Sequence, residues 1–386
     1  MPAFTSSSFR AEFPHEKGLI YLNHAGVGPI PTRSANRMKA LADTMATVGA
    51  FRYPETFGSQ WDEARHRTAR LINADMESVA FIPNTSSGLS YIAIGMDWKK
   101  GDSIVTTDQE FPSNSLIWQD QISRHGAKVH RVPSGLNGRV SAEKLLERVD
   151  QSTRIIAVSS IQFGSGAGID LEILSEALQD TDTLLVVDAI QSLGVLPMDV
   201  KRLKVDAVVA DGHKWLLGPE GCGLFYLSDK ARAQIQSRVL GWHSLANAGE
   251  YNRTCYDIRD DMKRFEPGTP NVIGAVAMGE SINLLLEVGL ASIRDRVRGM
   301  TGYLAEALLK MGCTIHTPME QDGKPSAGIV VFSHPDYDMN VLSSLLMKQG
   351  IYHAKRGPGL RLSPHFYLNG ADIEQAITDI QKALSR

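Results

Sequence analysis

One lysine stands where a sheet could present it to a ligand. Lys214 follows a short apolar run, residues 205–210, which is bounded by turn residues and predicts a buried strand. A glycine- and proline-rich turn over residues 218–221 then precedes a second predicted strand over residues 222–227. In open α/β sheets, ligands bind at the ends of strands. Because most lysines are solvated surface cations, Lys214 needs chemical partners elsewhere in the chain to be a catalytic candidate.

A phosphate-binding pattern follows another predicted strand, residues 78–83. That strand leads into the run Asn84-Thr85-Ser86-Ser87-Gly88, after which the apolar spacing of a helix begins. Free backbone N–H groups and the positive end of the helix dipole meet at such a turn, which suits an anion. Thr and Ser are also ordinary helix caps, so this pattern alone leaves capping open as the alternative.

Three further side chains follow predicted strands. Asp188 closes the apolar run of residues 184–187, Gln191 lies three positions later, and Phe111 follows a strand over residues 103–106. A lysine, an acid, a phosphate cradle and a flat aromatic ring at one sheet edge fit pyridoxal 5′-phosphate (PLP). The lysine amine forms a Schiff base with this cofactor, and an acid keeps its ring nitrogen protonated, which makes the ring an electron sink.

The elements that must position these residues alternate along the chain. Helical spacing separates seven predicted strands, so we expect an α/β fold with a mainly parallel sheet between helices. The predicted strands cover residues 78–83, 103–106, 128–132, 154–159, 183–187, 205–210 and 222–227. After Leu227 the alternation weakens, and the C-terminal part mixes strands and helices. We predict a large α/β domain over residues 20–270 and a smaller α+β domain formed by residues 1–19 and 271–386.

Composition excludes several classes of function. The chain has 386 residues and a net charge of −3, which points to neither nucleic acid nor an anionic membrane surface. The first residues lack the apolar core of a signal peptide, and no apolar run approaches the roughly 20 residues of a membrane span. The 3 cysteines are scattered, with no disulfide or zinc-binding spacing. We therefore expect a cytoplasmic protein without a metal site.

A nicotinamide site is the weaker cofactor hypothesis. Residues 164–168, Gly-Ser-Gly-Ala-Gly, follow a predicted strand and are similar to a dinucleotide-binding fingerprint. The third glycine comes one position early, and no acidic residue closes a later strand at the required distance. We expect no dinucleotide there.

Seven stretches carry a resemblance that spans nearly the whole chain. They are YLNHAGVGP, NTSSG, EFPSN, VVDAIQSLG, DGHKWLLGPEGCG, FEPGTPN and LRLSPHFYLN. In this order the set resembles the class-V aminotransferase group of fold-type I PLP enzymes. That group contains cysteine desulfurases, isopenicillin N epimerase-like proteins, kynureninase and several C–S lyases. The resemblance implies a fold-type I architecture and PLP as cofactor.

The resemblance also assigns cofactor contacts. Lys214 would carry the Schiff base and then move protons, while Asp188 would pair with the ring nitrogen and Gln191 with the ring hydroxyl oxygen. Phe111 would stack on the ring. The phosphate would be held by the side chains of Thr85, Ser86 and His213.

Contacts to substrate and to a second subunit follow from the same resemblance. Arg361 matches the arginine that grips the substrate carboxylate, a bidentate task that suits a guanidinium. Asn23 and His24 are predicted on the substrate side of the site. Thr269 matches a phosphate ligand given by the neighbouring subunit, so the resemblance implies a homodimer with shared active sites.

The sequence departs from the desulfurase pattern at three places. Residues 352–359, where desulfurases carry a nucleophilic cysteine, contain none. Phe111 stands where desulfurases commonly stack a histidine, and a phenyl ring cannot donate a proton. Asp211 stands where many members have a phosphate-binding serine. Because a carboxylate repels a phosphate, we expect Asp211 to turn away and cap a backbone N–H.

These observations predict a PLP-dependent enzyme that acts at the α-carbon of a small amino acid. An aminotransferase-like outcome is favoured, because it needs no group beyond Lys214. A β-eliminating lyase acting on cysteine or a cysteine conjugate, or an epimerase, remains the alternative. A non-catalytic scaffold with the same fold is disfavoured, because the lysine, the acid and the arginine are all present.

Overall fold

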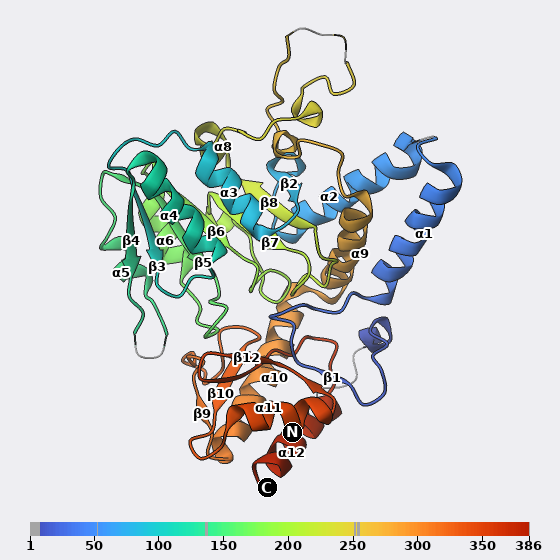
Figure 1. The fold of residues 1–386 in the computed structure, drawn as a ribbon, viewed down its shortest axis with the longest axis vertical. Coiled ribbons are helices and arrows are strands. Elements are labelled where there is room, and N and C mark those ends of the chain that lie inside the picture. Colours follow the sequence, from blue (N-terminus) through green and yellow to red (C-terminus); the bar gives the residue numbers. More distant parts are fainter. Residues whose placement is uncertain (1–7, 52, 136–137, 251, 253–254, 386) are drawn as a thin grey trace.

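The computed structural model describes residues 8–51, 53–135, 138–250, 252 and 255–385 (Figure 1). Its centre is a seven-stranded sheet in the order β2-β8-β7-β6-β5-β3-β4. The strands are β2 (Val79–Ile82), β3 (Ser103–Thr107), β4 (Lys128–Val132), β5 (Thr153–Ser159), β6 (Leu184–Asp188), β7 (Ala207–Asp211) and β8 (Gly223–Leu227). Only β8 runs antiparallel to its neighbours, so the predicted mainly parallel sheet is confirmed.

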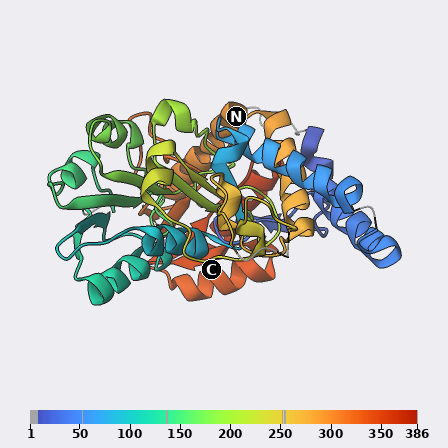
Figure 2. The same cartoon turned by 90° about the horizontal axis from the view of Figure 1, so that it is seen from above.

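Helices cover both faces of this sheet, as the view from above shows (Figure 2). They are α1 (Thr32–Val48), α2 (Ser59–Leu71), α3 (Thr85–Gly95), α4 (Ser113–His125), α5 (Ala142–Leu146), α6 (Leu171–Leu178), α7 (Val200–Leu203), α8 (Asp229–Gln234) and α9 (Val272–Val288). Neighbouring strand residues enter opposite cores. Val186 packs in one core with Leu89 of α3 and Trp118 of α4, whereas Val187 packs in the other with Leu174 of α6. With both faces covered, the central strands β5, β6 and β7 are largely apolar, whereas the edge strand β4 reads KVHRV and is partly exposed.

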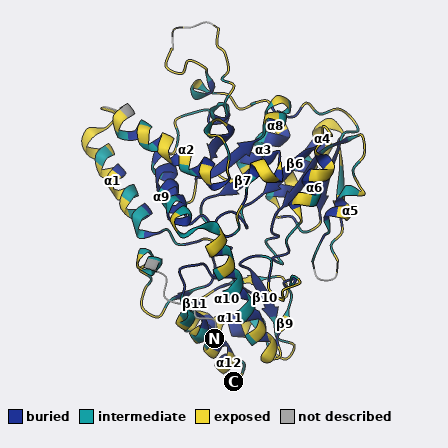
Figure 3. Cartoon of the chain, turned by 180° about the vertical axis from the view of Figure 1, so that it is seen from behind, coloured by how far each residue is buried: buried dark blue, intermediate teal, exposed yellow. Residues whose placement is uncertain are grey.

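The C-terminal part is a second, smaller layer of helices on an antiparallel sheet. Its sheet has the order β12-β13-β10-β9. Its elements are α10 (Leu290–Lys310), β9 (Thr314–Ile315), β10 (Val330–Ser333), α11 (Met339–Lys348), β11 (Ile351–Tyr352), β12 (Ala354–Arg356), β13 (Gly359–Leu362) and α12 (Gly370–Leu384). Helix α12 buries Ile373, Ile377 and Ile380 on one face, while its other face is exposed (Figure 3).

Packing crosses both predicted domain boundaries. Strand β1 (Ile20–Tyr21) pairs in parallel with β11, and Asn23 bridges to Ser363, so the chain just after residue 19 belongs to the C-terminal layer. Helix α9 lies beside α1 and α2 on the large sheet's side (Figure 1). These contacts join the segments on either side of residues 19 and 270, and the two domain boundaries stay a prediction.

Helix α9 leads into α10 through Gly289, whose φ of 85° ends the first helix. Within the described ranges, no single helix has the length and apolar character of a membrane span. Only α9 and α10 taken together reach both, and the chain bends by 82° between them. Much of α9 is buried in the fold, from Val272 to Leu285.

Candidate active site at the carboxyl ends of the strands

The carboxyl ends of β6 and β7 bring an acid and a lysine to the same edge of the sheet. Asp188 is the last residue of β6 and pairs with Val209 of β7, and Lys214 follows the end of β7 by three residues. Among the described residues, Lys214 Nζ forms no hydrogen bond or ion pair, and it lies 5.7 Å from the centroid of the Phe111 ring. Burial lowers the pKa of Lys214 to about 8, an effect that Asp188 opposes and Arg361 reinforces. A desolvated amine of this kind is a good nucleophile and proton carrier near neutral pH.

Asp188 is buried and acts electrostatically on this lysine. Its Oδ1 accepts a hydrogen bond of 3.0 Å from the backbone N–H of Ile190. Burial raises the pKa of Asp188 to about 7, with the nearby Glu110 carboxylate acting in the same direction and Lys214 opposing it. A buried carboxyl with few local donors has a strong preference for a cationic partner, which a protonated pyridine nitrogen supplies.

The turn before α3 fits a phosphate. Asn84 caps the helix, since its side-chain oxygen accepts hydrogen bonds from Ser87 N at 2.9 Å and Ser87 Oγ at 3.0 Å. Thr85 is therefore not needed as a cap, and its buried Oγ1 has no hydrogen-bond partner. Ser86 Oγ lies 2.6 Å from Ser113 Oγ of α4. Because buried hydroxyls are almost always bonded, the unpartnered Thr85 hydroxyl at a helix N-terminus indicates a missing acceptor such as phosphate.

Phe111 and Phe163 form an aromatic wall next to Lys214. Their ring centroids are 5.0 Å apart and the planes are inclined by 85°. Phe111 is 41% exposed, so its ring is available to a ligand above Lys214. This arrangement suits the predicted stacking on a cofactor ring.

Arg361 joins the site from β13. Its Nη1 donates to the backbone oxygen of Phe163 at 3.0 Å, and its Nη2 lies 3.5 Å from Asn23 Oδ1. The side chain is 1% exposed, its Nε has no hydrogen-bond partner, and among described residues it meets no carboxylate. Burial, aided by Arg356, lowers the pKa of Arg361 to about 9. A buried guanidinium without a counter-ion is costly, and a substrate carboxylate would relieve that cost.

Gln191 links two segments of the site. Its Oε1 accepts from Trp215 Nε1 at 2.9 Å, and its Nε2 donates to the backbone oxygen of Ala25 at 3.0 Å. One amide N–H remains for a ligand. The predicted bond to the cofactor's ring oxygen stays a prediction, and the side chain also fixes Trp215 next to Lys214.

The expectation for Asp211 is wrong. Its buried Oδ1 has no hydrogen-bond partner and lies 3.4 Å from His213 Nδ1, so it faces the neighbouring histidine and does not cap a backbone N–H. His213 is partly exposed beside Lys214. Asp211 thus lies beside the His213 ring, and the predicted contact of His213 to phosphate remains a prediction.

The structure contradicts the prediction that His24 contacts the substrate. The ring is fully buried, with Nδ1 2.8 Å from the Ser363 carbonyl oxygen and Nε2 2.8 Å from the Tyr367 hydroxyl. Both ring nitrogens are thus used within the protein. Burial lowers the pKa of His24 well below its ordinary value, as expected of a structural histidine. Asn23, in contrast, does reach the Arg361 side chain.

Thr269 lies apart from this group. It is exposed and lines a cavity of about 220 Å³ with Phe81, Pro83 and Phe265. Among the described residues its hydroxyl makes no hydrogen bond. Its predicted role toward a neighbouring subunit therefore stays a prediction.

Glu110 is a buried site residue to which the sequence analysis assigned no role. Its carboxylate accepts hydrogen bonds from Ser159 N at 2.9 Å, Ser159 Oγ at 2.6 Å, Asn114 Nδ2 at 2.7 Å and Gln162 Nε2 at 2.8 Å. These bonds tie the loop that carries Phe111 to the end of β5. The position directly before Phe111, after a strand end, is the only sequence signal for this role.

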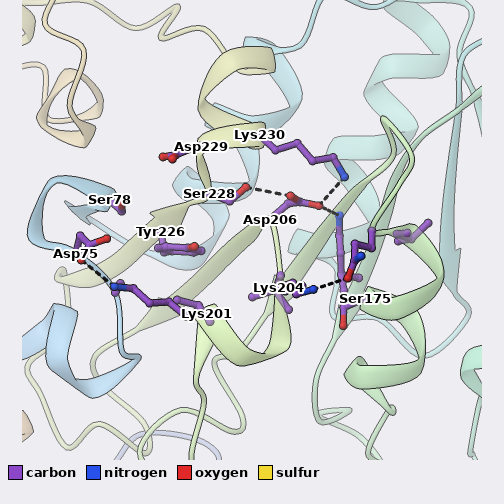
Figure 4. Close-up of a pocket in the computed structure, with 16 residues that line it drawn as sticks. Asp75, Ser78, Ser175, Lys201, Lys204, Asp206, Tyr226, Ser228, Asp229 and Lys230 are labelled. Carbon is purple, nitrogen blue, oxygen red and sulfur yellow. Dashed lines mark hydrogen bonds and ion pairs between the residues drawn. The ribbon is translucent and has the colours of Figure 1, made fainter.

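A cavity of about 370 Å³ lies at the opposite edge of the sheet, where β6 begins (Figure 4). It contains several charged side chains that pair with one another. Lys201 Nζ is 2.9 Å from Asp75, and Lys230 Nζ is 2.7 Å from the Thr183 carbonyl oxygen and 3.3 Å from Asp206. Because these charges are compensated within the chain, we place the chemistry at the Lys214 edge.

Comparison with known proteins identifies the family of this chain. Residues 20–361 match the family Aminotransferase class-V. The chain is 29% identical over 300 residues to a probable cysteine desulfurase of Pyrococcus abyssi, covering 77% of this chain and 73% of that protein. It is 28% identical over 336 residues to the uncharacterized aminotransferase YcbU of Bacillus subtilis, covering 84% and 85%.

Solved structures share the fold at lower identity. A C-DES mutant with glycine covalently linked to the PLP cofactor has a TM-score of 0.89 and 23% identity, covering 97% of this chain and 99% of that one. The apo cysteine desulfurase of Thermococcus onnurineus has a TM-score of 0.88 and 23% identity, covering 100% of both chains. With the family match and the lysine, acid and phosphate cradle at one edge, this chain belongs to the class-V aminotransferase family and is a PLP-dependent enzyme.

Proposed function

We propose that this enzyme carries out an aminotransferase-like reaction at the α-carbon of a small amino acid. The observation that carries the proposal is the unpaired, desolvated Lys214 amine between Asp188 and Phe111. When bound, PLP supplies an electron sink for charge that develops at the α-carbon. The chain's own residues then have to bind the substrate carboxylate, hold the ring nitrogen and move one proton.

Each of these tasks has a candidate side chain. Arg361 binds the α-carboxylate with its two-pronged guanidinium, and Asp188 holds the protonated ring nitrogen. Lys214 Nζ would accept the proton from the substrate α-carbon and would hold it for return to the product. Phe111 excludes water from one face and cannot exchange protons, so a single base serves both transfers. Transamination requires only this set.

A β-eliminating C–S lyase is the second candidate. Two specific observations favour it: relatives of this chain bear the name cysteine desulfurase, and a solved structure of the same fold is named as a cystine C–S lyase complex with cysteine persulfide. Residues 352–359 contain no cysteine, so transfer of sulfur through a cysteine on that loop is disfavoured. Elimination needs no such cysteine and could use Lys214 alone.

We also propose that the enzyme works as a homodimer. Thr269 is exposed and makes no hydrogen bond with the described part of its own chain, which leaves its hydroxyl available to a second copy. Mass measurement under native conditions, combined with Thr269→Val, tests this. A dimer whose variant binds PLP less tightly supports it, and a monomer with full PLP affinity contradicts it.

A single-turnover experiment separates the two reactions. PLP-loaded enzyme is mixed with a panel of amino acids in the absence of a keto acid. The proposal predicts one keto acid and one pyridoxamine phosphate per active site. Continuous release of pyruvate with ammonia or sulfide, with the cofactor returning to PLP, would show the lyase reaction instead.

A further inference from the structure

A second arginine lies on the same face of the β12–β13 hairpin as Arg361. In this antiparallel pair Ala354 lies opposite Arg361, and Arg356 lies opposite Gly359. Residues opposite one another, and residues two apart on a strand, project from the same face of a sheet. Arg356 and Arg361 are therefore diagonal neighbours on one face, and Arg361 shows that this face is turned toward Phe163 and the site.

Lys355, which directly precedes Arg356, projects from the opposite face of the hairpin. Lys355 pairs with Leu360, and its Nζ donates to Asn340 Oδ1 of α11 at 3.1 Å. Helix α11 lies within the C-terminal layer. Arg356 and Arg361 therefore share the face of the hairpin that is turned toward the site, and Lys355 lies on the opposite face. Lys355 is a matched control because it is a neighbouring cation that does not face the site.

Arg356 has no counter-ion. Its Nη1 donates to the Lys355 backbone oxygen at 2.8 Å, its Nε is buried without a hydrogen-bond partner, and it meets no carboxylate in the part of the chain that the structure describes. Its charge contributes to lowering the pKa of both Arg361 and Lys214, in keeping with its place on the same face of the hairpin. One substrate carboxylate satisfies Arg361 and leaves the partly exposed Arg356 guanidinium available to a second anion.

We propose that Arg356 binds a second anionic group, and that the substrate is an amino acid whose side chain ends in a carboxylate or a sulfinate. This inference rests on the proposed function, in which Arg361 takes the α-carboxylate. It makes Arg356 the specificity-determining residue on the loop that has no cysteine. Both groups present two oxygen acceptors, which match the guanidinium's paired donors.

Ligands without an amine test the inference apart from catalysis. Succinate carries two carboxylates and butyrate one, and neither can react with the cofactor. Binding to the PLP-loaded enzyme is measured as a shift in cofactor absorbance and as a shift in Tm. We expect succinate to bind about 10- to 100-fold more tightly than butyrate, the gain from one charged hydrogen-bonded contact.

Substitutions show which side chain is responsible for the tighter binding of succinate. Arg356→Gln should remove the preference for succinate and leave butyrate binding unchanged, whereas Lys355→Gln should change neither. Arg356→Lys keeps the charge without the paired donors and should retain part of the preference. Equal binding of succinate and butyrate by the unmodified enzyme, or equal losses for both ligands in Arg356→Gln, would overturn the inference.

Reactive amino acids distinguish this inference from the proposed function. Aspartate and cysteine sulfinate should react with higher kcat/KM than asparagine and alanine. Equal turnover of neutral amino acids would refute the role of Arg356 while transamination still stands. If succinate binding depends on Arg356 but the products are those of elimination, the proposed function is wrong and the anion site remains.

Discussion

Lys214 Nζ lies 5.7 Å from the centroid of the Phe111 ring, and no hydrogen bond from the described residues holds it. The ring and the amine come from different strand ends, after β3 and after β7. Their separation leaves room for a flat group that stacks on Phe111 while joined to the lysine. The geometry of the site is therefore set by two loops that the parallel sheet brings to one edge.

Replacement of Phe111 tests the stacking surface. Phe111→Leu keeps an apolar side chain but removes the ring, so PLP affinity should fall about 2- to 10-fold, the value of an aromatic pair beyond its buried area. Phe111→Tyr keeps the ring and serves as the control. Equilibrium dialysis of PLP measures both, and equal affinity of the leucine and tyrosine variants would show that the ring does not stack.

Thr85→Val tests the phosphate cradle. The Thr85 hydroxyl has no partner within the protein, so the valine variant of the apoenzyme should be no less stable than the unmodified apoenzyme. Loss of a hydrogen bond to a charged phosphate should weaken PLP binding by about 1.5–3 kcal/mol. Urea unfolding of the apoenzyme and PLP titration check the two parts. Destabilisation without any change in PLP affinity would contradict the assignment.

The buried Asp188 predicts a pH dependence of the apoenzyme. Burial raises its pKa from 3.8 to about 7, so the folded chain holds this proton more tightly than the unfolded chain. The contribution of Asp188 to stability is therefore highest below about pH 4 and falls as pH rises toward 7. Lys214, whose pKa is lowered from 10.5 to about 8, acts in a separate window above pH 8.

The measurement compares apoenzyme with Asp188→Asn by urea unfolding from pH 4.5 to 7.5, a range set by that shift. The asparagine variant lacks the titration, so its stability relative to the unmodified apoenzyme should increase steadily across this range. A constant difference between the two proteins would show that Asp188 has an ordinary pKa.

Glu110→Gln tests the carboxylate that anchors the Phe111 loop. An amide in place of one oxygen sets N–H donors against those of Ser159, Asn114 or Gln162, so two strong hydrogen bonds are lost. The free energy of unfolding should fall by about 3 kcal/mol. The exposed Glu143→Gln is the matched control and should change it by less than about 0.5 kcal/mol. Similar values for both variants would contradict the anchoring role.

Much of this architecture could be predicted from local pattern. Apolar runs bounded by turn residues predicted the central strands β5, β6 and β7, because strands buried on both faces are largely apolar. The alternation of strands and helices added the edge strand β4, which is polar and partly exposed. Parallel strands then place the residues after their carboxyl ends at one edge, which is why Lys214, Asp188, Thr85 and Phe111 could be grouped without a structure.

Features that depend on contacts between residues far apart in the sequence could not be predicted from local pattern. His24 lies in a turn that looks free, but its partners Ser363 and Tyr367 come from the other end of the chain. The pairing of β1 with β11 is equally remote in sequence. Glu110 was missed because an acidic residue in a loop is exposed far more often than buried. Its partners Ser159 and Gln162 are about 50 residues away in the sequence and reach Glu110 only in the folded chain.

The assignment of the active site depends most on Lys214, and borohydride reduction tests directly whether Lys214 carries the cofactor. The PLP-loaded enzyme is reduced and digested, and the peptides are analysed by mass spectrometry. We predict that the pyridoxyl group is found on the peptide that contains Lys214, and that Lys214→Ala takes up no covalent label, whereas Lys204→Ala is labelled like the unmodified enzyme. A pyridoxyl group on another lysine, with Lys214 unlabelled, would contradict the assignment of the active site.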